Sequence, residues 1–295
     1  MGVFMCGRSA NAMEPLPGTE PPVDTRSLAM ADAQRAFSAN TAGVYLNPAI
    51  MSMAAVYHVN VKYQFTGKDN LHNAGVVFLD SITSSRIAAG ASLDYRRDSR
   101  ANSYFESWDA RLALSTGIAN KFFIGLTGRY LRAAHDITSG TFGPNRRPAL
   151  ERSSNIQANG FTFDAGIAAR LGKYVIFGLA GYNLTKTDTV FAPICLGGGF
   201  SFLIKRIWLV ETDALADFTS YEGVGARLAF GTELLIKEVF AIRAGYSHEF
   251  FMHINQVSAG LGYTWKRAAL DLGYRQDIEF PGRFRLALGL RIFVG

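Results

Sequence analysis

The stretch YHVNVKYQFT, Tyr57–Thr66, alternates apolar and polar side chains along its whole length. Successive side chains of a β-strand point to opposite faces, so strict alternation predicts a strand with one apolar and one polar face. A helix would mix the two sets, because its faces repeat every 3.6 residues. The apolar set is Tyr57, Val59, Val61, Tyr63 and Phe65, and the polar set is His58, Asn60, Lys62 and Gln64.

The same alternation recurs through the rest of the chain and predicts fourteen strands. Their expected ranges are 56–65, 73–81, 86–96, 103–117, 121–132, 160–171, 174–184, 194–204, 207–216, 223–235, 239–248, 256–265, 268–278 and 283–294.

The connections between these strands alternate between tight and longer ones. An even number of strands, with every tight turn on one rim and every longer loop on the other, is typical of an outer-membrane barrel. The stretch FLIKRIWLV, 202–210, is therefore two strands meeting at a polar tip. The tight turns fall at Ser84-Ser85, Asn120-Lys121, Gly172-Lys173, Lys205-Arg206, Lys237-Glu238 and Lys266-Arg267.

The composition of the two faces separates a membrane barrel from a soluble one. In the last strand Phe284, Leu286 and Leu288 oppose Arg285 and Ala287. Small residues mixed with isolated charges suit a crowded lumen, and bulky apolar residues suit lipid. We predict an all-β fold: a 14-stranded antiparallel transmembrane β-barrel over 56–295, with its outer face against membrane lipid.

Composition excludes several other classes of protein. The chain has 295 residues and no run approaching the roughly 18 apolar residues of a membrane helix. The formal charge is +6, but Lys and Arg are spread singly, so we expect no nucleic acid partner. The two cysteines, Cys6 and Cys195, match no metal or redox spacing, and we expect no metal and no cofactor.

The chain before the first strand divides into two parts. Ala10-Asn11-Ala12 has the small-x-small form of a signal-peptidase site, which makes residues 1–12 a signal-peptide remnant; ordinary terminal residues are the alternative. Fourteen strands enclose a lumen too wide for their own side chains to fill. We expect residues 13–55 to be an N-terminal plug, with Ser27 capping a helix from Leu28 to Phe37; a periplasmic helix or tail is the alternative.

The run ADAQRAFSANTAGVYLNPAIM, 31–51, resembles the amino-terminal region of the long-chain fatty-acid transporter (FadL) superfamily and its PorV relatives. In that family a similar segment forms a hatch inside a fourteen-stranded barrel. The resemblance implies hatch or gating roles for matching residues, whereas local turn chemistry at Asn-Pro is the simpler reading. This chain departs from the family in its short loops. The implied hatch residues are Asp32, Asn40, Asn47, Pro48 and Ala49.

Charges of both signs recur on the predicted lumen face. Unpaired charges in a confined lumen are costly, so we expect them to pair with one another or with the plug; a selectivity filter or anionic head-group site is the alternative. The lumen charge ladder contains Arg111, Arg129, Arg170, Arg227, Arg243, Glu233 and Asp271, together with Arg275, Arg285, Arg291, Asp94, Asp109, Asp164 and Asp213.

No catalytic site is predicted, and we expect no enzyme activity. His248 and His253 are five residues apart instead of the four that place two zinc ligands on one helix face. The cluster Gly197-Gly198-Gly199 lacks the lysine of a phosphate loop and is expected to let the plug or a kink approach the wall.

Three functions remain open at this point. The resemblance implies passive, hatch-gated transport of a hydrophobic or amphipathic, fatty-acid-like ligand. A structural subunit that binds a large outer-membrane partner in a secretion or motility complex, as the PorV group does, is the second function. The third is a water-filled porin. All three place the chain in the bacterial outer membrane, with both termini expected on the periplasmic side.

Overall fold

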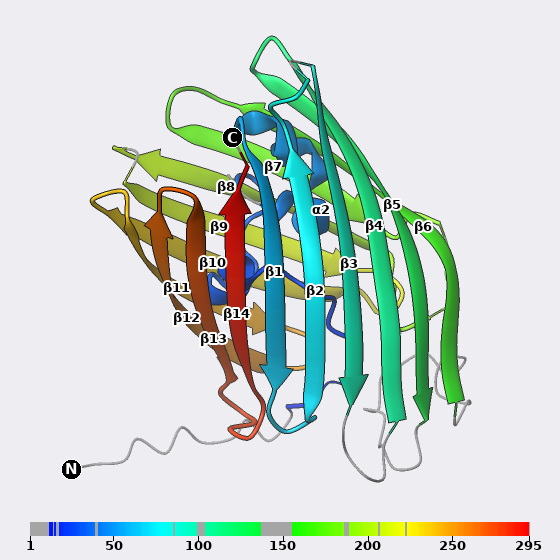
Figure 1. The fold of residues 1–295 in the computed structure, drawn as a ribbon. Helices are drawn as coiled ribbons and strands as arrows, with labels where there is room; N and C mark the ends of the chain where they lie inside the picture. Colours follow the sequence, from blue (N-terminus) through cyan, green and yellow to red (C-terminus); the bar gives the residue numbers. More distant parts are fainter. Residues whose placement is uncertain are drawn as a thin grey trace, which may run out of the picture.

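The computed structural model describes residues 12–13, 15, 18–38, 41–84, 86–98, 104–136, 155–185, 189–205, 207–221 and 223–294. These residues form one closed antiparallel barrel in which every strand pairs with its neighbours in sequence and β1 pairs with β14 (Figure 1). The strands are β1 (Tyr57–Thr66), β2 (Leu71–Asp80), β3 (Ile87–Asp98), β4 (Tyr104–Ile118), β5 (Phe122–Asp136), β6 (Asn155–Arg170), β7 (Val175–Tyr182), β8 (Cys195–Ile204), β9 (Trp208–Asp217), β10 (Gly225–Ile236), β11 (Phe240–Glu249), β12 (Ile254–Trp265), β13 (Ala268–Asp277) and β14 (Phe284–Phe293).

The predicted fold class is confirmed, and each of the fourteen predicted strands is present. The largest differences are at β5 and β6, which are longer than predicted; β6 begins at Asn155 instead of residue 160. The strand pair predicted in FLIKRIWLV is β8 and β9, joined beyond Ile204 by a turn in which Lys205 has φ 51°.

The barrel has two distinct rims. The connections β2–β3, β4–β5, β6–β7, β8–β9, β10–β11 and β12–β13 meet at one end, which we call the short-turn rim and which lies at the top of Figure 1. The other seven connections meet at the opposite end, the long-loop rim. Met13 donates its backbone N–H to Met252 in the β11–β12 connection, whereas Val294 donates to Tyr57 at the start of β1.

The ends of the described chain therefore lie at opposite rims. The expectation that both termini lie on the periplasmic side stays a prediction, because residues 1–11 and 295 lie outside the described ones. Within the described chain, the segment before β1 runs up through the lumen instead of staying at one rim.

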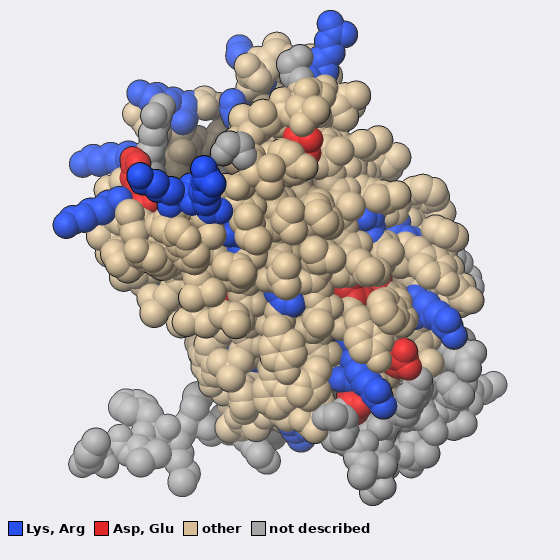
Figure 2. All heavy atoms as spheres, viewed as in Figure 1, with Lys and Arg blue, Asp and Glu red and all other residues tan. Residues whose placement is uncertain are grey.

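The outer surface of the barrel is apolar, as the alternation predicts. Val61 and Leu112 are 51% and 72% exposed, whereas His58 and Lys62 on the opposite parity are 0% and 2% exposed. Figure 2 shows a broad belt of uncharged side chains between two charged ends. An apolar band facing outward and polar groups facing inward are the pattern of a barrel with lipid around it.

None of the helices in the described part of the chain is long and apolar enough to span a membrane.

The segment before β1, which we call the plug and define as residues 18–38 and 41–55, packs inside the barrel. It contains α1 (Thr25–Ala29), α2 (Gly43–Leu46) and the 3₁₀ helix η1 (Pro48–Met53). The predicted helix from Leu28 to Phe37 is wrong. Asp24 and not Ser27 caps α1, accepting from the Arg26 N–H at 2.9 Å. The chain then turns at Ala31 and Asp32, which have φ 53° and 59°.

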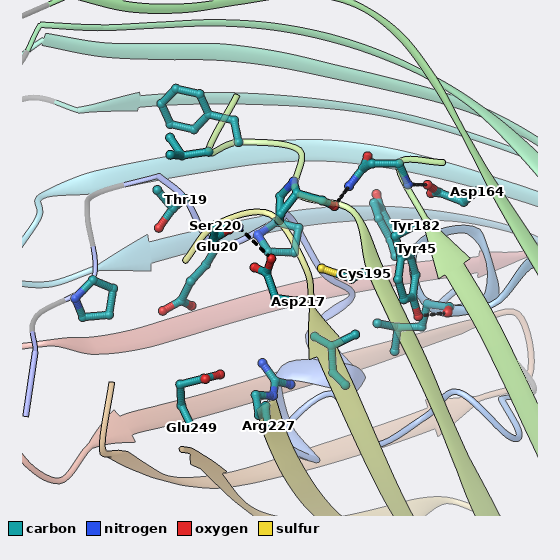
Figure 3. A pocket seen from close by; sticks show the side chains of 18 of the residues that line it. Thr19, Glu20, Tyr45, Asp164, Tyr182, Cys195, Asp217, Ser220, Arg227 and Glu249 are labelled. Atoms are coloured by element: carbon teal, nitrogen blue, oxygen red, sulfur yellow. Dashed lines mark hydrogen bonds between the residues drawn. The ribbon is translucent and has the colours of Figure 1, made fainter. Parts of the chain in front are cut away.

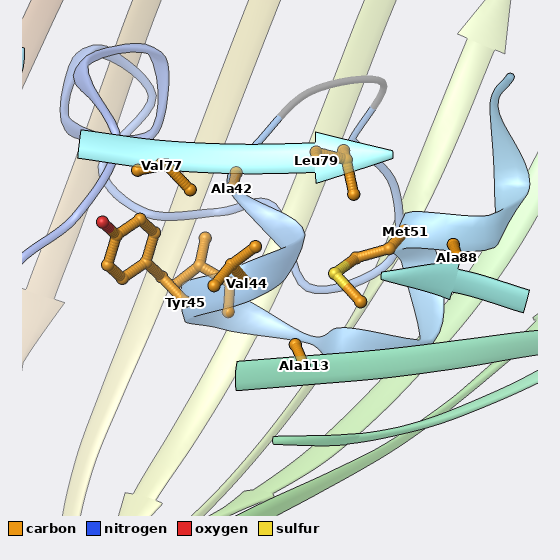
Figure 4. Close-up of a cluster of buried hydrophobic side chains, with 9 residues drawn as sticks. Ala42, Val44, Tyr45, Met51, Val77, Leu79, Ala88 and Ala113 are labelled. Carbon is orange, nitrogen blue, oxygen red and sulfur yellow. The ribbon is translucent and has the colours of Figure 1, made fainter. Parts of the chain in front are cut away.

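Apolar side chains join the plug to the wall in several clusters, the largest of them on the side of β2 and β4. Val44, Tyr45 and Met51 pack against Val77 of β2 and Ala113 of β4 (Figure 4). This burial excludes water from that side of the lumen and stabilises the docked plug.

On the opposite side of the lumen, β7 and β8 have glycines where the plug lies against them, and the missing side chains let the plug approach the wall. A Cβ added at Gly178 of β7 would lie 2.1 Å from the Arg35 carbonyl oxygen, and one at Gly197 of β8 would lie 2.5 Å from the Arg35 Nε. The expectation that the triple-glycine run lets the plug approach holds at Gly197, whereas a Cβ at Gly198 or Gly199 would meet atoms of β7 or β9. Glycine is needed at Gly178 and Gly197 because any side chain would occupy the space of the plug.

We expect Gly178→Ala to lower the free energy of unfolding by about 1–3 kcal/mol, because its methyl group must displace the plug backbone. Gly160→Ala in the neighbouring strand β6 is the matched control, since a Cβ there meets nothing within 4 Å. Urea unfolding of both variants in the same detergent measures the difference. Equal stability of the two variants would show that the plug does not press on β7.

Candidate functional site

Asp32 is the point at which the plug turn is held to the wall. Its Oδ2 accepts from Arg275 Nη1 at 2.8 Å and from Arg227 Nη2 at 3.2 Å. The same two guanidiniums donate to the carbonyl oxygens of Leu28 at 2.9 Å and Ala31 at 3.0 Å. Burial raises the pKa of Asp32, which lies in the plug, but Arg275 and Arg227 lower it to about 2, so the carboxylate stays charged.

A second group of ion pairs centres on Glu233 of β10. Its carboxylate accepts from Arg26 of the plug at 2.7 Å and from Arg243 of β11 at 2.6 Å. Arg243 continues to Asp271 of β13 at 2.7 Å, and Asp271 also accepts from Arg291 of β14 at 2.9 Å. Four of the predicted ladder residues thus form one chain of alternating charge across four strands.

The third group lies on the other side of the lumen. Asp109 of β4 accepts from Arg111 at 2.9 Å and from Arg129 of β5 at 2.5 Å, and Arg111 also donates to the Tyr45 carbonyl at 3.4 Å. Arg170 of β6 donates to the Met53 carbonyl at 2.8 Å. Each ladder residue therefore contacts an opposite charge or a plug carbonyl.

The Asn47-Pro48-Ala49 run joins α2 to the wall. Asn47 donates through Nδ2 to the Arg35 carbonyl at 2.7 Å and to the Ile167 carbonyl of β6 at 3.2 Å, while its Oδ1 accepts from the Ala49 N–H at 3.0 Å. Pro48 begins η1. These residues therefore form a local turn at Asn-Pro and also connect the plug to the wall. Asn40, the remaining hatch prediction, lies outside the described residues.

Sequence reasoning missed several anchors inside the lumen. Lys62 of β1 lies 2.8 Å from Asp94, donates to the Val23 carbonyl at 2.9 Å and lies 4.0 Å above the Tyr45 ring. Arg35 of the plug pairs with Asp213 at 3.1 Å. The parity of Lys62 marks it as inward-facing, but nothing local in the sequence distinguishes the plug arginines from solvent-exposed ones.

A cavity separates the plug from the long-loop rim. Its volume is about 200 Å³, and Figure 3 shows side chains from the plug, the strands and the loops converging on it. Its floor is the plug itself, through Arg35, Tyr45 and Leu46. Tyr182 of β7 holds this floor, because its hydroxyl donates to the Leu46 carbonyl and accepts from Arg35 Nε at 2.8 Å.

The walls of the cavity differ in polarity. One side is apolar and includes Val190 and Phe191, from the β7–β8 connection that folds inward, whereas Leu215 of β9 lies on the other side, where it pairs with Arg227 of β10. The other side carries Arg227 and Glu249, which Figure 3 places close together at the edge of the cavity. Such a site fits a small molecule with an apolar body and one polar end.

The histidines considered in the sequence do not converge on a site. His248, at the end of β11, contacts Asn255 Oδ1 at 2.9 Å, and His253 is an exposed turn residue with φ 53°. No cluster of metal-ligating side chains exists among the described residues.

Comparison with known proteins relates this architecture to solved structures. No protein-family model and no curated protein matches the chain. The Ralstonia pickettii toluene transporter TbuX has a TM-score of 0.67 and 12% identity, with 92% of this chain and 98% of that chain covered.

Two further solved structures agree. A Pseudomonas aeruginosa FadL homologue has a TM-score of 0.63 and 12% identity, covering 92% of this chain and 98% of that one. The Pseudomonas putida toluene transporter TodX has a TM-score of 0.59 and 12% identity, covering 91% and 96%. The chain thus has the fold of these FadL-like barrels.

Proposed function

We propose that the chain is an outer-membrane channel for small hydrophobic or amphipathic molecules, with the plug as its gate. The observation that carries the proposal is the cavity between the long-loop rim and the plug, which is mainly apolar on one side and charged on the other. The solved structures of the same fold include toluene transporters, which supports a hydrophobic ligand.

The cavity favours an amphipathic ligand over a purely hydrophobic one. Arg227 supplies a partly exposed guanidinium, and Glu249 has one buried carboxylate oxygen, Oε1, without a hydrogen-bond partner. A buried polar atom of this kind gains from a ligand group that can hydrogen-bond with it. Val190, Phe191 and Leu215 would contact the apolar body of such a ligand.

Passage along the barrel axis requires the plug to move, because the plug forms the cavity floor. Its contacts are ion pairs and hydrogen bonds at discrete points, together with four apolar clusters among the described residues. Release of the plug would expose these charges together, so opening is expected to be a cooperative event instead of a gradual loosening.

Leu215→Trp tests the cavity. The larger ring would fill cavity space beside Arg227, so we expect uptake of a labelled long-chain fatty acid or of toluene into proteoliposomes to fall at least about tenfold. Leu228→Trp on β10, where the side chain is 42% exposed on the lipid side, is the matched control and should leave uptake unchanged. Uptake no greater than in protein-free liposomes by the wild type would overturn the proposed function.

A disulfide tests the gate. Ser52 of the plug and Ser115 of β4 have their Oγ atoms 2.8 Å apart, so S52C with S115C, made together with C6S and C195S, should form a cross-link. We expect uptake to fall at least about tenfold in the oxidised protein and to return on reduction, because the locked plug cannot leave the floor of the cavity.

The single variant S52C is the control for the cross-link, since it changes the plug without tying it to β4. Equal uptake by oxidised and reduced protein would rule out gating by this part of the plug while leaving transport itself intact. Ligand would then have to leave sideways through the wall.

A structural role beside a large partner is the second candidate. The plug is anchored to strands on opposite sides of the lumen, through Arg35 to β9 and through Tyr45 to Asp94 of β3, which also fits a static barrel. Purification in mild detergent distinguishes the transport role from the structural role. A large protein that copurifies in stoichiometric amount, together with no uptake by proteoliposomes that contain the barrel, supports the structural role.

A further inference from the structure

All six connections of the short-turn rim carry at least one exposed cation. Within their described residues Glu238 is the only acidic side chain, and it too is exposed. Figure 2 shows the Lys and Arg side chains projecting from this end of the barrel. The cations, which we call the basic ring, are Arg86 (β2–β3), Lys121 (β4–β5), Lys173 (β6–β7), Lys205 (β8–β9), Lys237 (β10–β11), and Lys266 with Arg267 (β12–β13).

Turn geometry does not explain why lysine stands at these tips. Lys205 and Lys237 both have φ 51°, in the left-handed region that Gly and Asn occupy at lower cost than Lys. Asn120, at φ 54° in the β4–β5 turn, shows the residue that this geometry favours. Lys205 and Lys237 therefore stand at positions where the backbone conformation disfavours lysine.

The basic ring lies next to aromatic side chains on the lipid-facing surface. Trp208, Phe240 and Trp265 follow or precede the turns and are 45%, 52% and 42% exposed. Lys173 Nζ lies 5.4 Å from the centre of the Tyr174 ring. Aromatic side chains of membrane proteins gather where the apolar layer meets the headgroups. The basic ring is thus placed at headgroup level.

We propose that the basic ring binds the anionic headgroups of phospholipids in the leaflet around the short-turn rim. The cations lie on the six consecutive turns of this rim, so they are spread around most of the closed barrel, whereas a protein partner would contact one sector or the end. Lys and Arg near a membrane surface attract anionic lipid, and their apolar stems can pack along the aromatic belt while the charge reaches the phosphate.

The proposal is tested with the purified full-length barrel. Native mass spectrometry measures retention of phosphatidylglycerol relative to phosphatidylcholine with the same acyl chains, supplied as an equal mixture. The test variant combines K205N, K237N, K266Q and R267Q, in which Asn also suits the backbone at the first two positions. We expect the preference of the wild type for phosphatidylglycerol to fall at least about tenfold in this variant.

A matched variant separates the basic ring from general loss of charge. K68Q, R97Q and R132Q remove three exposed cations from the half of the barrel toward the long-loop rim, and this variant should retain most of the wild-type preference. Absence of any preference in the wild type, an unchanged preference in the test variant, or an equal loss in the matched variant would each overturn the proposal. None of these outcomes bears on transport, which the uptake assays measure separately.

Discussion

The pairing of β1 with β14 is the constraint on which the rest of the structure depends. It satisfies the backbone of the first and last strands, so the closed sheet exposes no edge to lipid. Closure also gives the sheet an outer and an inner face. Because successive side chains of a strand point to opposite faces, they alternate between the lipid and the lumen. Val61 faces outward and Lys62 inward for this reason alone.

Closure creates a second requirement, because the inward parity carries charge into a confined lumen. Arg275 could not be buried there without an anion, and Asp32 of the plug supplies it. Glu233 of the wall is likewise paired with Arg26 of the plug. Plug and wall therefore each hold charges that only the other neutralises, which makes the docked plug part of the fold of the lumen and not an added domain.

Sequence reasoning predicted the barrel well because its signal is local and repeated. Alternation predicts each strand without reference to its neighbours, and the inward position of Arg111 or Arg243 follows from parity alone. The partners of these residues were not predictable, since they depend on register and on a plug that meets many strands. The plug helix was misplaced for the same reason: the turn at Asp32 is fixed by Arg227 and Arg275 of distant strands, not by local capping.

The cavity is a consequence of where the plug stops filling the barrel. Apolar packing and ion pairs fill the lumen toward the short-turn rim. Toward the long-loop rim the β7–β8 connection folds inward and leaves space between itself and Tyr45. Tyr45 belongs to both regions, since its ring lies beside Lys62 and lines the cavity. A ligand that moved Tyr45 would disturb the Lys62–Asp94 ion pair next to it. Binding of a ligand in the cavity would therefore be coupled to release of the plug through Tyr45.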